Sequence, residues 1–195
     1  MTTSVKETGW PDRVIAGMMP LVRDWPPQDD VEIPSPSLVA AWLVLDTLAT
    51  ERVPLWAAHW LAAGHGGEAL AELAGLRGDD PREVRDLLDG PLAECGVTAP
   101  DIDAANHRAE RAAAMVAFTA IAELQVNGRA SERWLVQKVV EIAEPYFPDW
   151  IVSLPLGQLS CLDDEWDADW GRSEEQLREI VNKSCIDQLR ESGIR

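Results

Sequence analysis

Residues 35–45, Ser-Pro-Ser-Leu-Val-Ala-Ala-Trp-Leu-Val-Leu, are the stretch that decides the fold of this 195-residue chain. Ser35 followed by Pro36 is typical of a helix start, because a serine side chain caps the first turn and proline fits its first position. Apolar residues then occupy nearly every face through Leu48, and a helix that is apolar all round is a buried one. The sequence therefore predicts a buried central helix over residues 36–51.

Helix signals continue on both sides of this stretch, and strand signals are few. Prolines, glycines and capping residues separate the predicted helices. We expect these at residues 11–19, 54–63, 68–74, 81–88, 131–144, 156–170 and 174–191, together with a long helix that is capped by Asp101 or Asp103 and ends at about Val126. The pattern predicts an all-α fold, a single irregular orthogonal bundle of about eight or nine helices around helix 36–51. Residues 1–9 are expected to form a loose tail, and residues 10–195 one helical domain with 68–97 as a tri-helical sub-unit.

The charge of the chain indicates what kind of partner it can have. It carries 34 acidic and 17 basic side chains, a formal net charge of −17. Such a charge repels nucleic acid and anionic membranes, and it favours a basic protein surface as the partner. The longest apolar run, residues 38–45, is too short to cross a bilayer.

Cysteine usage and overall composition indicate where the protein works. Cys95, Cys161 and Cys185 lie far apart without CxxC spacing, which is typical of reduced thiols rather than of a disulfide framework. The first residues lack the apolar core of a signal peptide. Together with an arginine-rich, lysine-poor composition typical of high-G+C bacteria, these features predict a bacterial cytoplasmic protein.

The densest acidic run of the chain is Asp163-Asp164-Glu165-Trp166-Asp167-Ala168-Asp169-Trp170. In the predicted helix 156–170, Leu159, Leu162, Trp166 and Trp170 would form one stripe between like-charged i,i+4 carboxylate pairs. Each pair would cost about 0.2–0.5 kcal/mol. Three interpretations follow: a solvated amphipathic helix, a divalent cation site, or a surface for a basic partner. The partner-binding residues would be Asp163, Glu165, Trp166, Asp167, Asp169 and Trp170.

Residues 68–97 contain a short Leu/Ala helix, a glycine turn at Gly75, and an Asp80-Pro81 start to a second helix with apolar Val84. This stretch resembles a bacterial helix-turn-helix. The resemblance implies that the second helix would contact DNA, through Arg82 and Arg85. Three acidic residues stand on the same helix surface, which is unfavourable towards phosphates, so we expect a structural unit.

No catalytic motif accompanies these features. The chain has no HExxH and no GxSxG sequence, and we predict no catalytic residue, metal or cofactor. Asp103, His107 and Glu110 share one helix face and could ligate a metal, but a polar helix start is the expected role. The sequence therefore favours a non-enzymatic acidic binding protein that engages a basic protein, for example an immunity or antitoxin-like inhibitor. The alternatives are a helix-turn-helix transcriptional regulator and an enzyme with an acidic metal-binding pocket.

Overall fold

The computed structural model describes residues 33–97 and 107–193, apart from residues 167 and 169. Within these ranges there are eight α-helices, five short 3₁₀ helices and no strand, so the predicted all-α class is confirmed. None of the described helices is long and apolar enough to cross a membrane. The predicted tail 1–9, the predicted helix 11–19 and the predicted start of the long helix at Asp101 or Asp103 lie outside the described residues.

Helix α1 (Pro36–Val44) begins where the sequence predicted, because the Ser35 side chain accepts a hydrogen bond from the Leu38 amide at 3.2 Å. It ends seven residues before the predicted limit of 36–51. Asp46 has a φ of 54°, a left-handed conformation that aspartate tolerates better than most residues and that cannot continue a helix. Leu45 and Leu48 remain buried, so the apolar pattern continues into the core beyond the end of the helix.

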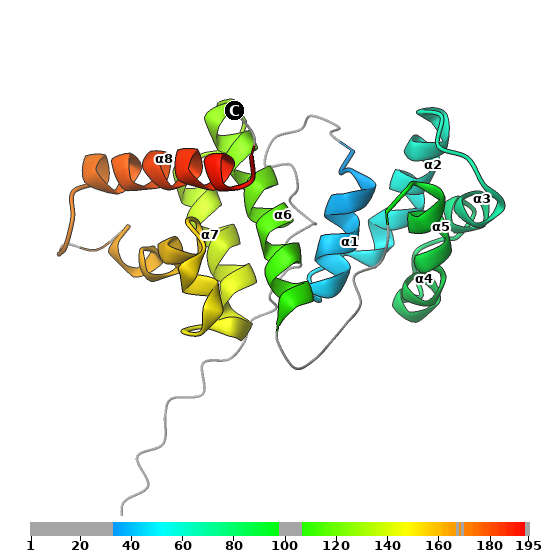
Figure 1. Cartoon of the computed structure of the whole chain (residues 1–195), viewed down its shortest axis with the longest axis horizontal. Helices are drawn as coiled ribbons and strands as arrows, with labels where there is room; N and C mark the ends of the chain where they lie inside the picture. The colour runs from blue at the N-terminus through cyan, green and yellow to red at the C-terminus, as the bar shows by residue number, and fades with distance from the viewer. Residues whose placement is uncertain (1–32, 98–106, 167, 169, 194–195) are drawn as a thin grey trace, which may run out of the picture.

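The longest helix, α6 (Arg108–Val126), runs through the middle of the molecule and packs against α1, α7 and α8 (Figure 1). Four short helices lie on the α1 side: α2 (Val53–Ala62), α3 (Glu68–Ala74), α4 (Pro81–Leu87) and α5 (Asp89–Glu94). On the other side of α6 lie α7 (Glu132–Ala143) and α8 (Glu174–Glu191). Residue Gly78, with a φ of +76°, precedes α4 and packs on the backbone of η1 (Thr50–Arg52).

Three tryptophans, Trp42, Trp56 and Trp60, lie in the core. The rings of Trp42 and Trp56 are 5.9 Å apart between centroids and both are fully buried. Trp60 donates its indole N–H to the Pro34 carbonyl oxygen at 2.9 Å. This bond fixes the residues before α1 onto α2, because a buried indole N–H stabilises the fold only where it finds an acceptor.

A buried amide joins α8 to its neighbours. Gln188 has no exposed surface, and its side-chain nitrogen contacts the Thr119 hydroxyl at 3.3 Å and the Met115 sulfur at 3.5 Å, both on α6. Its carbonyl oxygen lies 3.5 Å from the Leu156 amide nitrogen. One side chain therefore links α6, α8 and the segment before α8, and a buried polar group with such partners favours one packing arrangement.

The predicted α-helix over residues 156–170 is wrong. The chain forms η4 (Gly157–Cys161) and η5 (Asp163–Glu165), two 3₁₀ helices, after η2 (Glu144–Tyr146) and η3 (Trp150–Ser153). Buried Leu156, Leu159 and Leu162 follow one another at steps of three, which is the period of a 3₁₀ helix. In an α-helix, the like-charged carboxylates of residues 163–170 would repel one another at i,i+4 spacing, so they do not stabilise the predicted α-helix.

Candidate functional site

The strongest candidate site is the acidic corner, which we define as residues 163–175. It contains seven acidic residues and one basic residue. The acidic corner connects η5 to α8. A capping box at the start of α8 fixes the end of this connection. The Ser173 hydroxyl accepts from the Gln176 amide at 3.3 Å, and the Gln176 side chain accepts from the Ser173 amide at 2.9 Å. Two amides at the start of the helix are therefore satisfied locally.

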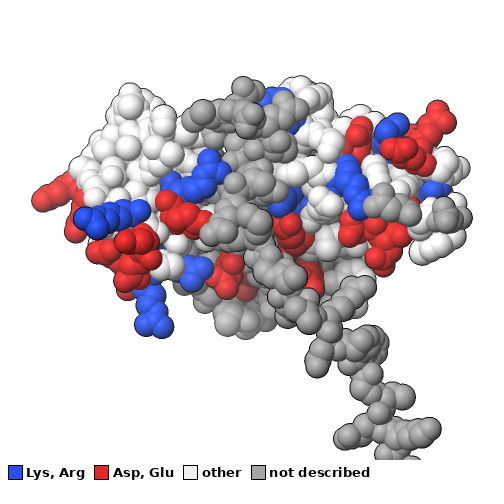
Figure 2. Space-filling model, turned by 180° about the vertical axis from the view of Figure 1, so that it is seen from behind, with Lys and Arg blue, Asp and Glu red and all other residues white. Residues whose placement is uncertain are grey.

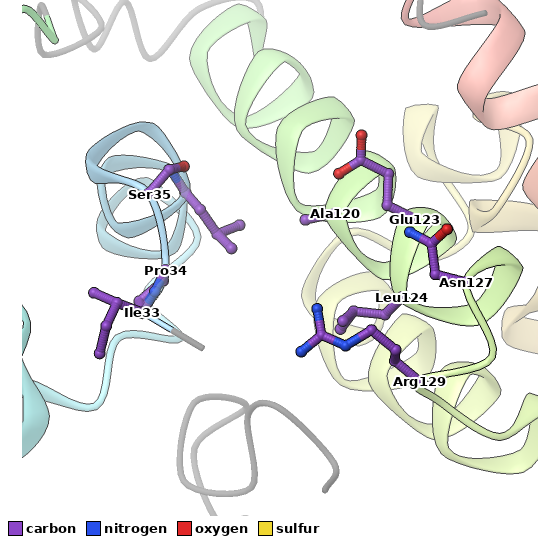
Figure 3. A pocket seen from close by; sticks show the side chains of 9 residues that line it. Ile33, Pro34, Ser35, Ala120, Glu123, Leu124, Asn127 and Arg129 are labelled. Atoms are coloured by element: carbon purple, nitrogen blue, oxygen red, sulfur yellow. The ribbon is translucent and has the colours of Figure 1, made fainter. Parts of the chain in front are cut away.

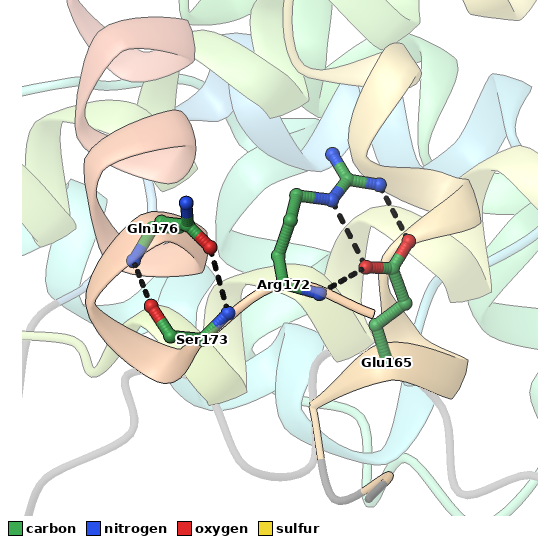
Figure 4. A network of polar contacts seen from close by, with 4 residues as sticks. All are labelled: Glu165, Arg172, Ser173 and Gln176. Atoms are coloured by element: carbon green, nitrogen blue, oxygen red, sulfur yellow. Dashed lines mark hydrogen bonds and ion pairs between the residues drawn. The ribbon is translucent and has the colours of Figure 1, made fainter. Parts of the chain in front are cut away.

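Glu165 and Arg172 close the corner (Figure 4). The two Glu165 carboxylate oxygens accept from two nitrogens of the Arg172 guanidinium, and one of them also accepts from the Arg172 amide at 3.3 Å. This two-point contact is the strong geometry for an arginine and a carboxylate. The Glu165 side chain is only 12% exposed, so its charge is used to hold the corner.

Gly171 allows the corner to close. Its φ is +94°, and a Cβ built there would lie 2.8 Å from the nearer Glu165 oxygen. A side chain would therefore be strained by the backbone conformation and would also displace the carboxylate. The hydrogen bond from the Arg172 side chain is the main cause that holds the pKa of Glu165 below its ordinary value.

The residues predicted to bind a partner fall into three groups. Glu165 is engaged by Arg172, and Trp166 is half-buried and packs against the core. Asp167 and Asp169 lie outside the described residues. Asp163 is half-buried, and Trp170 is 65% exposed, more than any other large hydrophobic side chain in the described part of the chain.

The predicted stripe of Leu159, Leu162, Trp166 and Trp170 therefore does not act as one face. Its first two members are in the core, the third is half-buried and the last is in solvent. Asp164, which the prediction omitted, is exposed and its side chain has no hydrogen-bond or ion-pair partner among the described residues. The acidic corner thus exposes the Asp164 carboxylate and the Trp170 indole, and the pair of Glu165 and Arg172 holds this corner together.

A second acidic region lies at the opposite end of the molecule, which we call the α3–α5 end (residues 67–97). It carries eight acidic and three basic residues, and Figure 2 shows acidic side chains towards both ends of one face. Arg85 pairs with Asp46 at 2.9 Å. Arg82 is exposed on the seven-residue α4, where Glu83 and Asp86 are exposed as well. Neither arginine is therefore accompanied by a basic surface on its helix.

The third group of candidate residues is at the start of α6. His107 lies 3.8 Å from the Glu110 carboxylate and stacks near Trp150, with ring centroids 6.3 Å apart. Asp103, the other member of the predicted face, lies outside the described residues. In the part of the chain that the structure describes, no three His, Cys, Asp or Glu side chains are grouped as a metal site would require.

Two roles of carboxylates were not predicted. Glu165 was predicted to bind a partner, whereas it contacts Arg172 across the turn at Gly171, where no continuous helix joins the two residues. Glu94 accepts from the Ala69 and Leu70 amides at 3.2 and 2.8 Å, so α5 caps the start of α3. Gly67 precedes α3 and has no side chain to cap it, which is the one signal in the sequence that α3 needs a distant cap. No protein family, curated protein or solved structure gives a significant match to this chain.

Proposed function

We propose that this chain is a non-enzymatic binding protein whose acidic corner engages a basic surface of another protein. The observation that carries the proposal is the exposure of Trp170, at 65%, within a segment of seven acidic residues and one basic residue. Tryptophan is the residue type most enriched at energetically important positions of protein interfaces. Acidic residues around it would attract a basic partner and would orient it during approach.

The corner is also prepared for contact. The pair of Glu165 and Arg172 and the capping box at Ser173 hold the segments on both sides of Trp170. A segment whose two ends are held in this way has less conformational entropy to lose on binding. Asp164 and Glu175 are exposed, and their side chains have no partner among the described residues, so they are available to lysine or arginine side chains.

An intracellular inhibitor of a cationic toxin, of the immunity or antitoxin kind, is the concrete form of this proposal. Such a protein works in the bacterial cytoplasm without catalysis and needs a strongly acidic surface. The net charge of −17 supports this form.

The test is capture of a partner by the tagged full-length chain from the source organism, followed by affinity measurement with the purified partner. We expect a basic partner whose affinity falls with ionic strength, because salt screens exposed charges. Trp170→Ser should weaken binding about 30-fold, the effect of losing a central interface residue. The matched control is Leu55→Ser, which changes another exposed apolar side chain, on α2.

Charge reversal tests whether the partner binds at the acidic corner or at the α3–α5 end. Asp164→Lys should weaken capture strongly, and Glu72→Lys on α3 should change it little, since both residues are exposed glutamate or aspartate positions at opposite ends. If Trp170→Ser and Asp164→Lys bind as the unchanged protein does, the acidic corner is not the interface.

A further inference from the structure

A groove runs along helix α6 on a surface separate from the acidic corner. Three adjoining cavities, with volumes of about 180, 420 and 240 Å³, follow one another along the helix. The largest shares Val116 with one neighbour and shares Leu38, Ala120 and Glu123 with the other. Helix α1 forms one wall of the groove, and Ser192, after α8, lines the other side.

The lining of this groove is mainly apolar and carries no net charge. The cavity nearest the start of α6 is lined by Ser37 and seven apolar residues. The two charged residues that line the three cavities, Glu123 and Arg129, have opposite signs. Val116, which lines two of the cavities, is 40% exposed. An apolar recess with a few polar groups is typical of a binding site.

The chain itself leads into the groove. Ile33, Pro34 and Ser35 line one of its ends, between α1 and the last turns of α6 (Figure 3). The 32 residues that precede Ile33 lie outside the described residues. A segment tethered at the end of a groove has an effective concentration there on the order of millimolar, which favours it over a separate partner.

This preceding segment has the composition that the groove requires. In the predicted helix 11–19, Val14, Ile15 and Met18 fall on one side, and Arg13 and Ala16 fall on the opposite side. A helix this short is not stable alone in water, so it needs a surface on which to pack its apolar side. Residues 11–25 contain two basic and two acidic side chains, so the acidic protein does not repel them.

We propose that the groove between α1 and α6 receives the segment 11–19 of the same chain, with Met18 in the largest cavity beside Leu38 and Val116. Residues 20–32 connect this segment to Ile33 and can span up to about 45 Å. The groove follows α6 from Ala109 to Asn127, about 27 Å for the rise of an α-helix. The connection therefore reaches every part of the groove.

The walls of the groove favour this occupant over a second copy of the chain. A recess between α1 and Ser192 accepts a single segment, whereas the face of another folded copy would rest on the walls and leave the bottom empty. The docked segment would bury Val116 and would complete the packing between α1 and α6. The acidic corner stays free, so the proposal does not depend on the proposed function.

The experiment follows the thiol of Val116→Cys in the full-length chain. A Cys161→Ser background removes the exposed natural cysteine, and mass spectrometry reads the alkylation rate at residue 116. The reference is Val126→Cys, because Val126 is 52% exposed on α6 and lines none of the three cavities. We expect residue 116 to react at least about tenfold more slowly than residue 126, since a covered thiol is shielded from the reagent.

Two changes in the segment test what covers the thiol. Met18→Asp should raise the rate at residue 116 at least about tenfold, because it replaces a docked apolar side chain by a charge. The matched control is Ala16→Asp, which adds the same charge on the opposite side of the predicted helix and should change the rate less than about twofold. The rate at residue 126 should be equal in all variants. Chemical denaturation establishes that each variant is folded.

A covalent test reports which side of the segment faces the groove. In the same Cys161→Ser background, Met18→Cys together with Val116→Cys should form a disulfide within one chain on mild oxidation, because the two thiols would be adjacent. Ala16→Cys together with Val116→Cys should not. Linking by both pairs, or by neither, would contradict the proposed placement.

Three results would overturn the proposal. The first is a residue 116 that reacts as fast as residue 126 in the unchanged segment, which would show that the groove is open. The second is protection that Met18→Asp reduces no more than Ala16→Asp does, which would show that another part of the chain covers the groove. The third is protection that is lost on dilution together with a dimer seen in sedimentation, which would assign the groove to a second copy.

Discussion

At the α3–α5 end, carboxylates complete the ends of helices, whereas at the acidic corner they surround an exposed aromatic ring. Glu94 caps α3, and Asp80 accepts from two amides at the start of α4, at 2.9 and 3.3 Å. At the corner, Glu165 closes a turn and Trp170 is left in solvent. No large hydrophobic side chain is prominently exposed among the described residues 67–97. The two acidic regions therefore support different interpretations: structural use at one end and contact at the other.

The largest expected effect on stability comes from Gly171→Ala at the corner. The left-handed backbone at Gly171 and the approach of its Cβ to Glu165 should together cost about 1–3 kcal/mol. Chemical denaturation of the two proteins measures this difference. The matched control is Gly96→Ala, since Gly96 also has a positive φ but has nothing within 4 Å of its Cβ. An equal loss in both variants would mean that only the backbone matters and that Glu165 does not require the space.

The next effect concerns the α3–α5 end. Glu94→Ala should destabilise the protein by about 1 kcal/mol, because two amides of α3 lose their acceptor. Gly67→Ala should cost a similar amount, since its Cβ would overlap the Glu94 carboxylate and displace it. The double variant should cost little more than either single one, and denaturation measures all three. Full additivity would contradict the distant cap.

Cys95 gives a second readout of the same cap. Its thiol pKa is raised by burial and then by the neighbouring Glu94 carboxylate. Glu94→Ala should therefore lower the pKa of Cys95 and increase its rate of alkylation. Cys185, whose pKa burial raises to about 12, should stay unreactive in both proteins while they are folded.

Lowering the pH is expected to have a smaller effect on stability, through Glu165 at the acidic corner. Because the pKa of Glu165 is lowered in the folded protein, its contribution to stability is present above the pKa of the unfolded chain and is lost as the pH falls through the folded value. The melting temperature of the unchanged protein should therefore lose its advantage over Glu165→Gln below about pH 4.3. Arg172→Met should give the same pH profile as Glu165→Gln. If the melting temperatures of both variants changed with pH in parallel with that of the unchanged protein, the pair of Glu165 and Arg172 would have no role in the acid dependence of stability.

The smallest effect is expected from Arg85→Ala. The pair with Asp46 is largely exposed, and exposed pairs contribute about 0.2–1 kcal/mol. The loss should disappear in the Asp46→Ala background, where the partner is already absent. Chemical denaturation at low salt measures the loss in the free energy of unfolding. A loss well above this range would mean that the pair of Arg85 and Asp46 stabilises the α3–α5 end more than an exposed ion pair should.

The sequence predicted helices well where local chemistry determined them. Ser35-Pro36 and Ser173 mark true helix starts, since caps act within one turn. The end of α1 at Val44 was not predicted, because the apolar pattern continues beyond it through the left-handed Asp46 to buried Leu48. The arrangement of the bundle around helix 36–51 stays a prediction.

The acidic corner was located from the sequence, but its geometry was not. Steps of three and four between Leu159, Leu162 and Trp166 fit an α-helix, and only the core contacts show that the 3₁₀ form is adopted. The pairing of Glu165 with Arg172 follows from the turn at Gly171. Neither feature has a local signal that distinguishes it from a solvated helix.

The 3₁₀ geometry before α8 has a consequence for how this segment can change in length. Leu156, Leu159 and Leu162 face the core once in every three residues. An insertion of a single residue between Leu159 and Leu162 would rotate the following positions by about 120°, whereas an insertion of three would return them to the same side. Natural variation in the length of this segment should therefore occur in multiples of three, with Glu165 and Arg172 carried along unchanged.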